Sequence, residues 1–522
     1  VLREQSSRQS TVSTFIVASS TFVSRLLGFL RTAVITAIFG ATGQADIINI
    51  TFAVPNNLRK LLAEGALSSA FIPVVSEAVG EEDEKRERSC TLVRNIITFQ
   101  LIIIIPICLL TLLFARQLIA HVLTQFDNPG QIELSASLFR FFINYLLFIG
   151  VSSVLIGVLN SHTRFFVPAI TPILFSIAVI ASILLLHGSL GVYSMAVGVL
   201  VGGAAQVAFQ LPLFKRLGYS LKPHFGFSNP DFRRVMKQWL PVLATSSVFT
   251  INQQVAFLLA SGLETGSASS LSYALVFFQL PFGIFSASIT TVLFPKMSSQ
   301  FSRGDTEGLR SSLQYGIRFL LVLLIPSSVV LGTLGREIVS IAIQRGLFTT
   351  ENTVLTAFVL TGYCYGLFSV GAFNFLQRFF YSAKNYRLPF YSAVTVAAVD
   401  IILSIILKET HLRVAGLSIA NSVSFTLGFV ILLISAYRLL GGLSLRKIAV
   451  TLGKGLTASL PVFAAITFLK GLFGDYWREG SSFIGLGLLL LQLAAAAAIY
   501  YLMYKILRVE MLDHLIKRKG EE

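Results

Sequence analysis

The chain has 522 residues, of which 54% are hydrophobic and 13% are charged, and its formal net charge is +16. At a mean hydropathy of +0.76, too few polar residues remain to cover a globule in water, so the composition excludes an ordinary soluble protein. Most basic residues lie between apolar runs, where membrane topology accounts for them, and we therefore expect no binding to nucleic acid.

Apolar runs of membrane-spanning length follow one another along the chain, beginning with residues 12–40 and 45–78. At about 20 apolar residues per span, these runs predict about fourteen transmembrane helices. Lys and Arg gather in alternate loops and in both tails, which by the positive-inside rule places both termini in the cytoplasm. The sequence therefore predicts an all-α, multi-pass protein that is embedded in the lipid bilayer.

The first predicted span contains two arginines inside an otherwise apolar helix. A charge at the centre of a membrane helix costs roughly 2.5–3.5 kcal/mol on insertion scales, so such residues face a cavity, a partner or a ligand. Arg25 and Arg31 would lie roughly 9 Å apart along the helix axis, and Gly28 between them permits a bend or the close approach of a substrate. We predict that both arginines contact the substrate; the alternative for Arg31 is a membrane interface or a pair with Asp46.

The second predicted span adds Asp46, Arg59, Lys60 and Glu64. Lys60 and Glu64 are four residues apart and are spaced to pair with each other, whereas Arg59 has no such local partner and is the third candidate for the cavity. For Asp46 we favour a gating pair near the outer opening; the alternatives are repulsion of a second anion and a pair with an arginine. Because arginine binds phosphate through a planar fork and stays charged, three arginines around one cavity predict a diphosphate as cargo.

The chain also contains an internal repeat. Three prolines of the first half recur in the second half at a nearly constant offset: Pro55, Pro73 and Pro168 correspond to Pro281, Pro295 and Pro389. The repeat predicts an N-terminal lobe at 1–220, a C-terminal lobe at 221–440, and an extra helix pair with a tail at 441–522; the alternative is chance alignment. Because only the first half carries the intramembrane charges, they indicate a ligand rather than a need of the fold.

Asp400 is a separate acid in a later apolar run. We predict an ion-coupling site there, with Asn252, Gln253 and Gln254 as further oxygen donors; the alternative is a hydrogen-bonded acid, with the amides joining helices. The three cysteines lie far apart, histidine is scarce, and no Gly-rich phosphate loop is present. We therefore expect no catalysis and no other metal or cofactor.

Several motifs together resemble the MurJ (MviN) family of lipid II flippases, which belongs to the multidrug, oligosaccharidyl-lipid and polysaccharide exporter superfamily. These motifs are SRLLGFLR at 24–31, QAD at 44–46, PNNLRK at 55–60, AEGALSSAFIP at 63–73, NSHTRFFVP at 160–168 and FYSAK at 380–384. The resemblance spans nearly the whole chain, and its N-terminal motifs are the most specific.

The resemblance implies two six-helix lobes forming a V around a central cavity, plus two C-terminal helices that help form a groove for a polyprenyl tail. The family moves an undecaprenyl-diphosphate-linked peptidoglycan precursor from the inner to the outer leaflet of the bacterial cytoplasmic membrane by alternating access. Its cavity arginines match Arg25, Arg31 and Arg59, and its acidic position matches Asp46. Some members bind sodium near the eleventh helix, where Asp400 falls. We expect a monomer that works beside cell-wall synthesis partners.

One departure concerns the eighth helix, where family members commonly carry an Asp-Arg pair. This sequence has Leu275 and Val276 there, so the fourth cavity arginine is missing and the headgroup contacts stay open. The alternative functions are export of another lipid-linked oligosaccharide or of drugs, a membrane glycosyltransferase acting on the same lipid, and a scaffold. A drug exporter is expected to need acidic or aromatic cavity residues, a glycosyltransferase needs a catalytic acid for which Asp46 is a thin candidate, and a scaffold leaves the charges unexplained.

Overall fold

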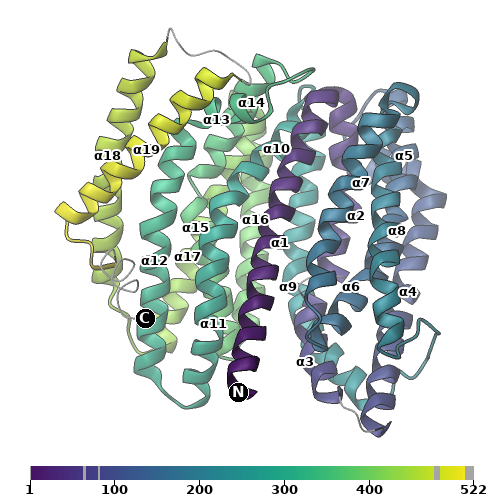
Figure 1. Cartoon of the computed structure of the whole chain (residues 1–522). Helices are drawn as coiled ribbons and strands as arrows, with labels where there is room; N and C mark the ends of the chain where they lie inside the picture. The colour runs from purple at the N-terminus through teal and green to yellow at the C-terminus, as the bar shows by residue number, and fades with distance from the viewer. Residues whose placement is uncertain (1, 63–65, 80–82, 475–481, 512–522) are drawn as a thin grey trace. The chain divides into compact units, whose positions relative to one another are not determined.

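The computed structural model describes residues 2–62, 66–79, 83–474 and 482–511, and these residues form helices and short turns without a strand. The chain divides into two compact units, Val1–Gly262 and Leu263–Glu522. The helices of the first unit (Figure 1) are α1 Leu2–Phe39, α2 Gly43–Leu62, α3 Ala66–Ala78, α4 Asp83–Leu118, η1 Ile119–Leu123, α5 Pro129–Ile143, α6 Tyr145–Ser161, α7 Phe166–Leu190, α8 Tyr193–Arg216 and α9 Pro230–Ser261. Here η marks a π-helical turn.

The second unit is also entirely helical in its described part. Its helices are α10 Ser267–Pro281, η2 Phe282–Ser286, α11 Ala287–Ser302, α12 Thr306–Thr333, α13 Gly335–Ile343, α14 Thr350–Cys364, α15 Leu367–Ser382, α16 Arg387–Lys408, α17 Arg413–Leu439, α18 Leu445–Leu472 and α19 Phe483–Ile506. The helix α9 packs against α2 and α3 in the first unit. The lobe boundaries at 220 and 440, which were derived from the repeat, stay predictions.

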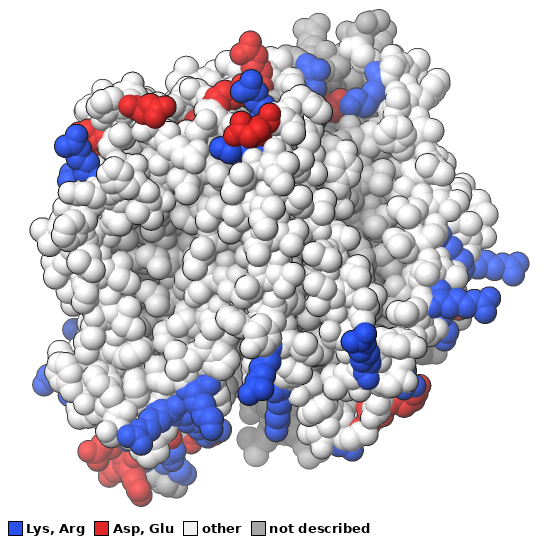
Figure 2. Space-filling model, turned by 180° about the vertical axis from the view of Figure 1, so that it is seen from behind, with Lys and Arg blue, Asp and Glu red and all other residues white. Residues whose placement is uncertain are grey.

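The apolar helices confirm an all-α membrane protein. Eleven helical segments in the described residues are long and apolar enough to cross a bilayer, or twelve if the bent pair α14 and α15 is one span. Figure 2 shows Lys, Arg, Asp and Glu gathered toward the helix ends on one face, with a largely uncharged middle. The predicted count of fourteen is not confirmed, since α1 and the α2–α3 pair, which cover the first two predicted spans, are not among these segments.

Close packing of α7 and α8 organises the core of the first unit. A Cβ atom added to Gly198 on α8 would lie 2.8 Å from the backbone Cα of Val179 on α7. Small residues of this kind let two membrane helices approach until their backbones touch. The helix α1 also packs along α7, so α7 positions the residues of α1.

In the second unit, α14 and α15 form a span that bends by 48°. At the bend, a Cβ atom on Gly366 would lie 2.6 Å from the Cα of Ser422 on α17. The Ser422 hydroxyl donates to the carbonyl oxygens of Gly362 at 2.6 Å and Tyr363 at 3.3 Å. The Gly366 N–H also donates to the Tyr363 oxygen at 3.0 Å, so backbone and side-chain donors together satisfy the carbonyls at the bend, as a break inside a membrane requires.

Candidate functional site

Arg31 lies on α1, half-buried against α7. Its guanidinium carbon lies 5.2 Å from the ring centroid of Phe175 on α7. A cation over an aromatic face gains about 0.5–2 kcal/mol, more when water is excluded. Among the described residues, no carboxylate forms an ion pair with Arg31. The arginine is therefore supported by an aromatic ring and keeps its hydrogen-bonding fork available.

A second cation lies near the first. Arg59 is in the last turn of α2, and its Nε donates to Asn56 Oδ1 at 3.2 Å. The Arg31 guanidinium interacts electrostatically with both Arg59 and Tyr145. Two like charges repel more strongly in a low-dielectric surrounding than in water, and an anion bound between them would turn the repulsion into attraction. Arg31 and Arg59 thus lie within electrostatic range of each other, and their contact with substrate stays a prediction.

Aromatic rings from four helices form the support beneath Arg31. Phe175 packs against Tyr145 on α6 at 5.3 Å between centroids. Tyr145 lies 6.3 Å from Phe52 on α2, and Phe52 lies 5.3 Å from Phe142 on α5. These rings connect the helix that carries Arg59 with the ring under Arg31, so they fix the relative positions of the two cations.

Two glycines on α8 make room for this support. A Cβ atom on Gly202 would lie 2.9 Å from the ring of Phe175, and one on Gly203 would lie 2.9 Å from the ring of Tyr145. Real Cβ atoms essentially never come so close to another atom, so any larger residue would shift the rings. Our sequence reasoning missed Phe175, Tyr145 and both glycines; the Gly-Gly pair inside an apolar run was the available signal.

Arg25 and Gly28 are the other two residues of α1 for which the sequence predicted a role in the site. The Arg25 side chain is exposed, and no contact among the described residues joins it to Arg31 or Arg59. The helix α1 continues through Gly28, and a Cβ atom there would meet no described atom within 4 Å. Open space beside Gly28 suits the predicted close approach of a substrate, while the predicted contact of Arg25 with substrate stays a prediction.

The remaining charges of α2 sit at its two ends. Asp46 is in the first turn and only 5% exposed, and Lys60 is in the last turn, where its Nζ donates to Asn57 Oδ1 at 3.3 Å. An acid at the start of a helix and a base at its end are both favoured by the helix dipole. Glu64, the predicted partner of Lys60, lies outside the described residues. The gating role of Asp46 stays a prediction.

Asp400 lies on α16 in the second unit and is 5% exposed. Its Oδ2 accepts a hydrogen bond from Asn421 Nδ2 at 3.0 Å, and its Oδ1 accepts one from Ser404 Oγ at 3.4 Å. Tyr363 is close enough to interact with it electrostatically. The carboxylate oxygens of Asp400 and the hydroxyl oxygen of Ser404 are the kind of ligand that a hard cation prefers, whereas the Asn421 nitrogen supports the carboxylate by a hydrogen bond. No group of three or more His, Cys, Asp or Glu side chains gathers in the described residues.

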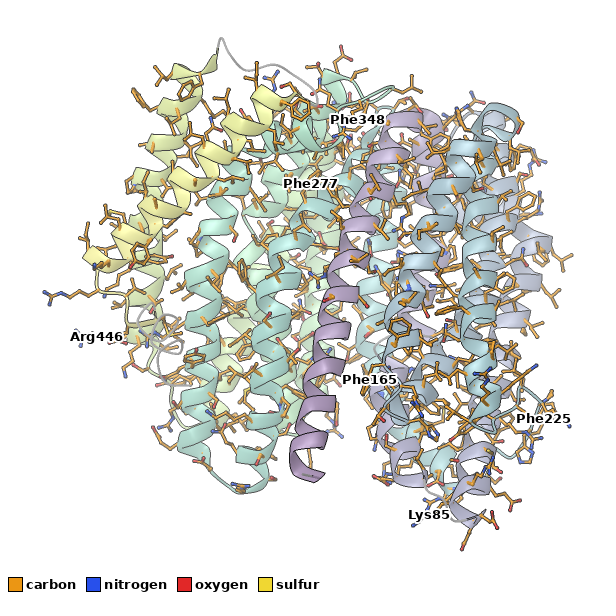
Figure 3. The ribbon with its side chains drawn as sticks, viewed as in Figure 1. Lys85, Phe165, Phe225, Phe277, Phe348 and Arg446 are labelled. Carbon is orange, nitrogen blue, oxygen red and sulfur yellow. The ribbon has the colours of Figure 1, made fainter. Side chains whose placement is uncertain are left out.

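Leu275 and Val276 lie on α10, half-buried, where the family pattern would have an Asp-Arg pair. Their neighbourhood is aromatic. Tyr273 packs against Phe348 at 5.8 Å between centroids, and Figure 3 places Phe277 and Phe348 at the same end of the second unit. Apolar packing thus occupies the part of α10 where the fourth arginine was missing from the sequence.

Comparison with known proteins identifies the family. A family model described as Lipid II flippase MurJ matches residues 35–487, which is most of the chain. The chain belongs to the MurJ family. A probable lipid II flippase MurJ from Borreliella burgdorferi is 33% identical over 507 residues, covering 97% of this chain and 98% of that protein. A probable lipid II flippase MurJ from Thermotoga maritima is 29% identical over 509 residues, with 97% and 98% covered.

Solved structures agree with this family assignment. The chain is similar to a structure of lipid II flippase MurJ in an inward closed conformation, with a TM-score of 0.78, 25% identity, and 95% of this chain and 100% of that chain covered. An inward-facing multidrug resistance transporter of the MATE family gives a TM-score of 0.64 at 13% identity, with 82% of this chain and 98% of that chain covered, and it shares the fold. As a member of the MurJ family the chain is a transporter and not an enzyme, which removes the glycosyltransferase alternative.

Proposed function

We propose that this lipid II flippase holds the diphosphate of its substrate between Arg31 and Arg59. One observation carries the proposal: Arg31 is seated on an aromatic ring without an ion pair among the described residues, beside a second guanidinium. A buried charge that lacks a protein counter-charge is costly unless a ligand supplies one. The phosphoryl oxygens of lipid II are suitable partners, because arginine forks bind them bidentately.

The proposed transport cycle is alternating access in the bacterial cytoplasmic membrane, with both chain termini in the cytoplasm. The headgroup would enter from the inner leaflet, bind the arginines, and leave toward the outer leaflet while the polyprenyl tail stays in the bilayer. Gly28 supports this route, because its α-carbon leaves open space on the same helix as Arg31. The chain would act as a monomer and would deliver its cargo to cell-wall synthesis partners.

The proposed driving force is a monovalent cation, sodium, at Asp400. Binding of substrate alone does not drive net transport; a gradient must bias the two conformations, and a bound ion that prefers one of them supplies such a bias. Asp400 and Ser404 on α16 offer oxygen atoms, and the Asn421 amide on α17 hydrogen-bonds the carboxylate, so movement of α16 against α17 would change the affinity for the ion. Asn252, Gln253 and Gln254 on α9 remain predicted donors only.

The test is a leaflet-accessibility assay for lipid II in cells that have this chain as their only flippase. We expect Arg31→Ala and Arg59→Ala each to lower translocation about ten- to hundredfold, since a charged hydrogen bond contributes about 1.5–3 kcal/mol. The matched control is Arg116→Ala, because Arg116 is 67% exposed and lies only 3.8 Å from Glu133. The control should retain the parental rate.

Expression and thermal stability must be measured for each variant, so that a folding defect is not taken for a transport defect. Parental translocation by both Arg31→Ala and Arg59→Ala at normal expression would contradict the assignment of the diphosphate site. Loss of translocation in Arg116→Ala to the same extent would show that any lost arginine impairs the protein, and it would contradict the site equally.

A further inference from the structure

A basic pocket lies in the second unit, away from the arginines of α1 and α2 in the chain. It is formed where α12, the start of α18 and the segment after α19 meet, and its volume is about 330 Å³. Figure 3 shows Arg446 at the outer edge of this unit, near the start of α18. The pocket is lined by Arg318, Ser444, Arg446, Lys447, Val450, Thr451, Lys454, Val509 and Glu510.

The inner wall of the pocket is held by hydrogen bonds. Arg318 donates from Nε to Thr451 Oγ1 at 2.9 Å and from an Nη atom to Glu510 Oε2 at 2.8 Å. Lys454 Nζ donates to the backbone oxygen of Arg508 at 2.9 Å. These contacts tie α12, α18 and the segment after α19 together, so the pocket keeps its shape without a ligand.

Two exposed cations, Arg446 and Lys447, complete the lining of the pocket. Neither forms an ion pair within the described part of the chain. Four cationic side chains line the pocket against a single carboxylate, that of Glu510. The hydrogen bond from Arg318 lowers the pKa of Glu510, so this acid is ionised at neutral pH and the pocket still has an excess of positive charge.

Apolar surface continues from the pocket along the membrane helices. Val450, which lines the pocket, is 47% exposed, and Leu456 on α18 and Ile506 on α19 are 50% and 62% exposed. Both helices are long and apolar enough to span a bilayer. A ligand with a phosphate at one end and acyl chains at the other would contact both kinds of surface, whereas a soluble phosphate would contact only the cations.

We propose that this pocket binds the phosphate headgroup of an anionic phospholipid, whose acyl chains lie along α18 and α19. Basic pockets between membrane helices at the cytoplasmic side are suited to such headgroups, and the positive-inside pattern places the start of α18 at that side. The site is separate from the proposed diphosphate site in both residues and structural unit. It would hold a resident lipid at the C-terminal helix pair.

The experiment uses the full-length protein purified in detergent and probed by native mass spectrometry with added phosphatidylglycerol. We expect the double variant Arg446→Gln with Lys447→Gln to bind phosphatidylglycerol about twentyfold more weakly, roughly fivefold for each removed charge. Glu510→Gln should bind it more tightly, because the competing carboxylate is gone and Arg318 is released. A role of these residues in folding alone would not produce changes of opposite sign.

The matched control removes two exposed arginines of the same unit that do not line the pocket, Arg303→Gln with Arg438→Gln. It should bind phosphatidylglycerol as the parent does. Equal binding by the parent and the Arg446/Lys447 double variant would overturn the proposal. Displacement of the bound lipid by millimolar inorganic phosphate would overturn the assignment to a lipid and would indicate a soluble phosphate site. Neither result tests the role of Arg31 in lipid II translocation, which the leaflet-accessibility assay measures separately.

Discussion

The two units each bury a charge among apolar helices, but they treat it differently. In the first unit, Arg31 rests on the ring of Phe175 and has a second cation near it. In the second unit, Asp400 accepts hydrogen bonds from Asn421 and Ser404. Neutral hydrogen-bond donors can support an acid on their own, whereas a guanidinium on an aromatic face still lacks an acceptor. The difference matches the two proposals, in which the first charge binds a large anion and the second a small ion.

The largest effect is expected from crowding the Phe175 ring beneath Arg31, which tests the first-unit half of this comparison. Gly202→Leu places atoms where the ring of Phe175 lies, and overpacking of this kind costs about 1–3 kcal/mol. We expect at least about a tenfold loss of lipid II translocation together with a lower unfolding temperature. The control is Gly188→Leu on α7, where a Cβ atom meets no described atom within 4 Å; equal loss in both variants would contradict the role of the ring.

The next test removes the charge of Asp400 and keeps its shape. Asp400→Asn retains one oxygen acceptor, so the fold should persist, but the variant loses the group that would bind a cation. We expect about a tenfold lower rate under an inward sodium gradient, which is the size of one lost charged contact, and no remaining dependence on sodium. Glu351→Gln, an exposed acid at the start of α14, is the control. Unchanged sodium dependence in Asp400→Asn would refute the coupling site.

A smaller effect tests the contact between Arg31 and Phe175 directly. Phe175→Leu keeps an apolar residue of similar volume and removes the aromatic face, which contributes about 0.5–1 kcal/mol at modest burial. We expect a two- to fivefold loss of translocation. In the Arg31→Ala background the same substitution should have almost no further effect, because the interaction is already gone. Additive losses in that double-mutant cycle would show that the ring acts on something other than the arginine.

The smallest effect is expected at Arg25. Its side chain is exposed, and among the described residues no ring holds it in place as Phe175 holds Arg31, so it is less well positioned to bind an anion. We expect Arg25→Gln to change translocation by less than about twofold, measured beside Arg31→Gln. A loss as large as that of Arg31→Gln would place Arg25 in the substrate site after all and would restore the three-arginine arrangement that the sequence suggested.

The sequence predicted what depends on local pattern. Apolar runs identify the membrane helices from α4 onward, and the charges that stand out against them identify Arg31, Arg59 and Asp400. The sequence could not predict Phe175 or Gly202 as parts of the site, because their roles depend on the contact of α1 with the distant helix α7 and on how closely α8 packs against α7. The sequence also could not predict that Arg25 is exposed. It lies six residues before Arg31 on the same helix, and only the packing of α1 decides which side of the helix is covered.

Asn421 and Ser422 are consecutive residues of α17 that hydrogen-bond to different helices. Asn421 donates to Asp400, while Ser422 donates to the carbonyl oxygens at the bend of the α14–α15 span. Two consecutive residues of α17 therefore contact the proposed ion-binding acid, Asp400, and the bend of the neighbouring α14–α15 span. An ion bound at Asp400 as proposed would therefore act one residue away from the hydrogen bonds at the bend of the α14–α15 span, which gives it a route to the shape of that span.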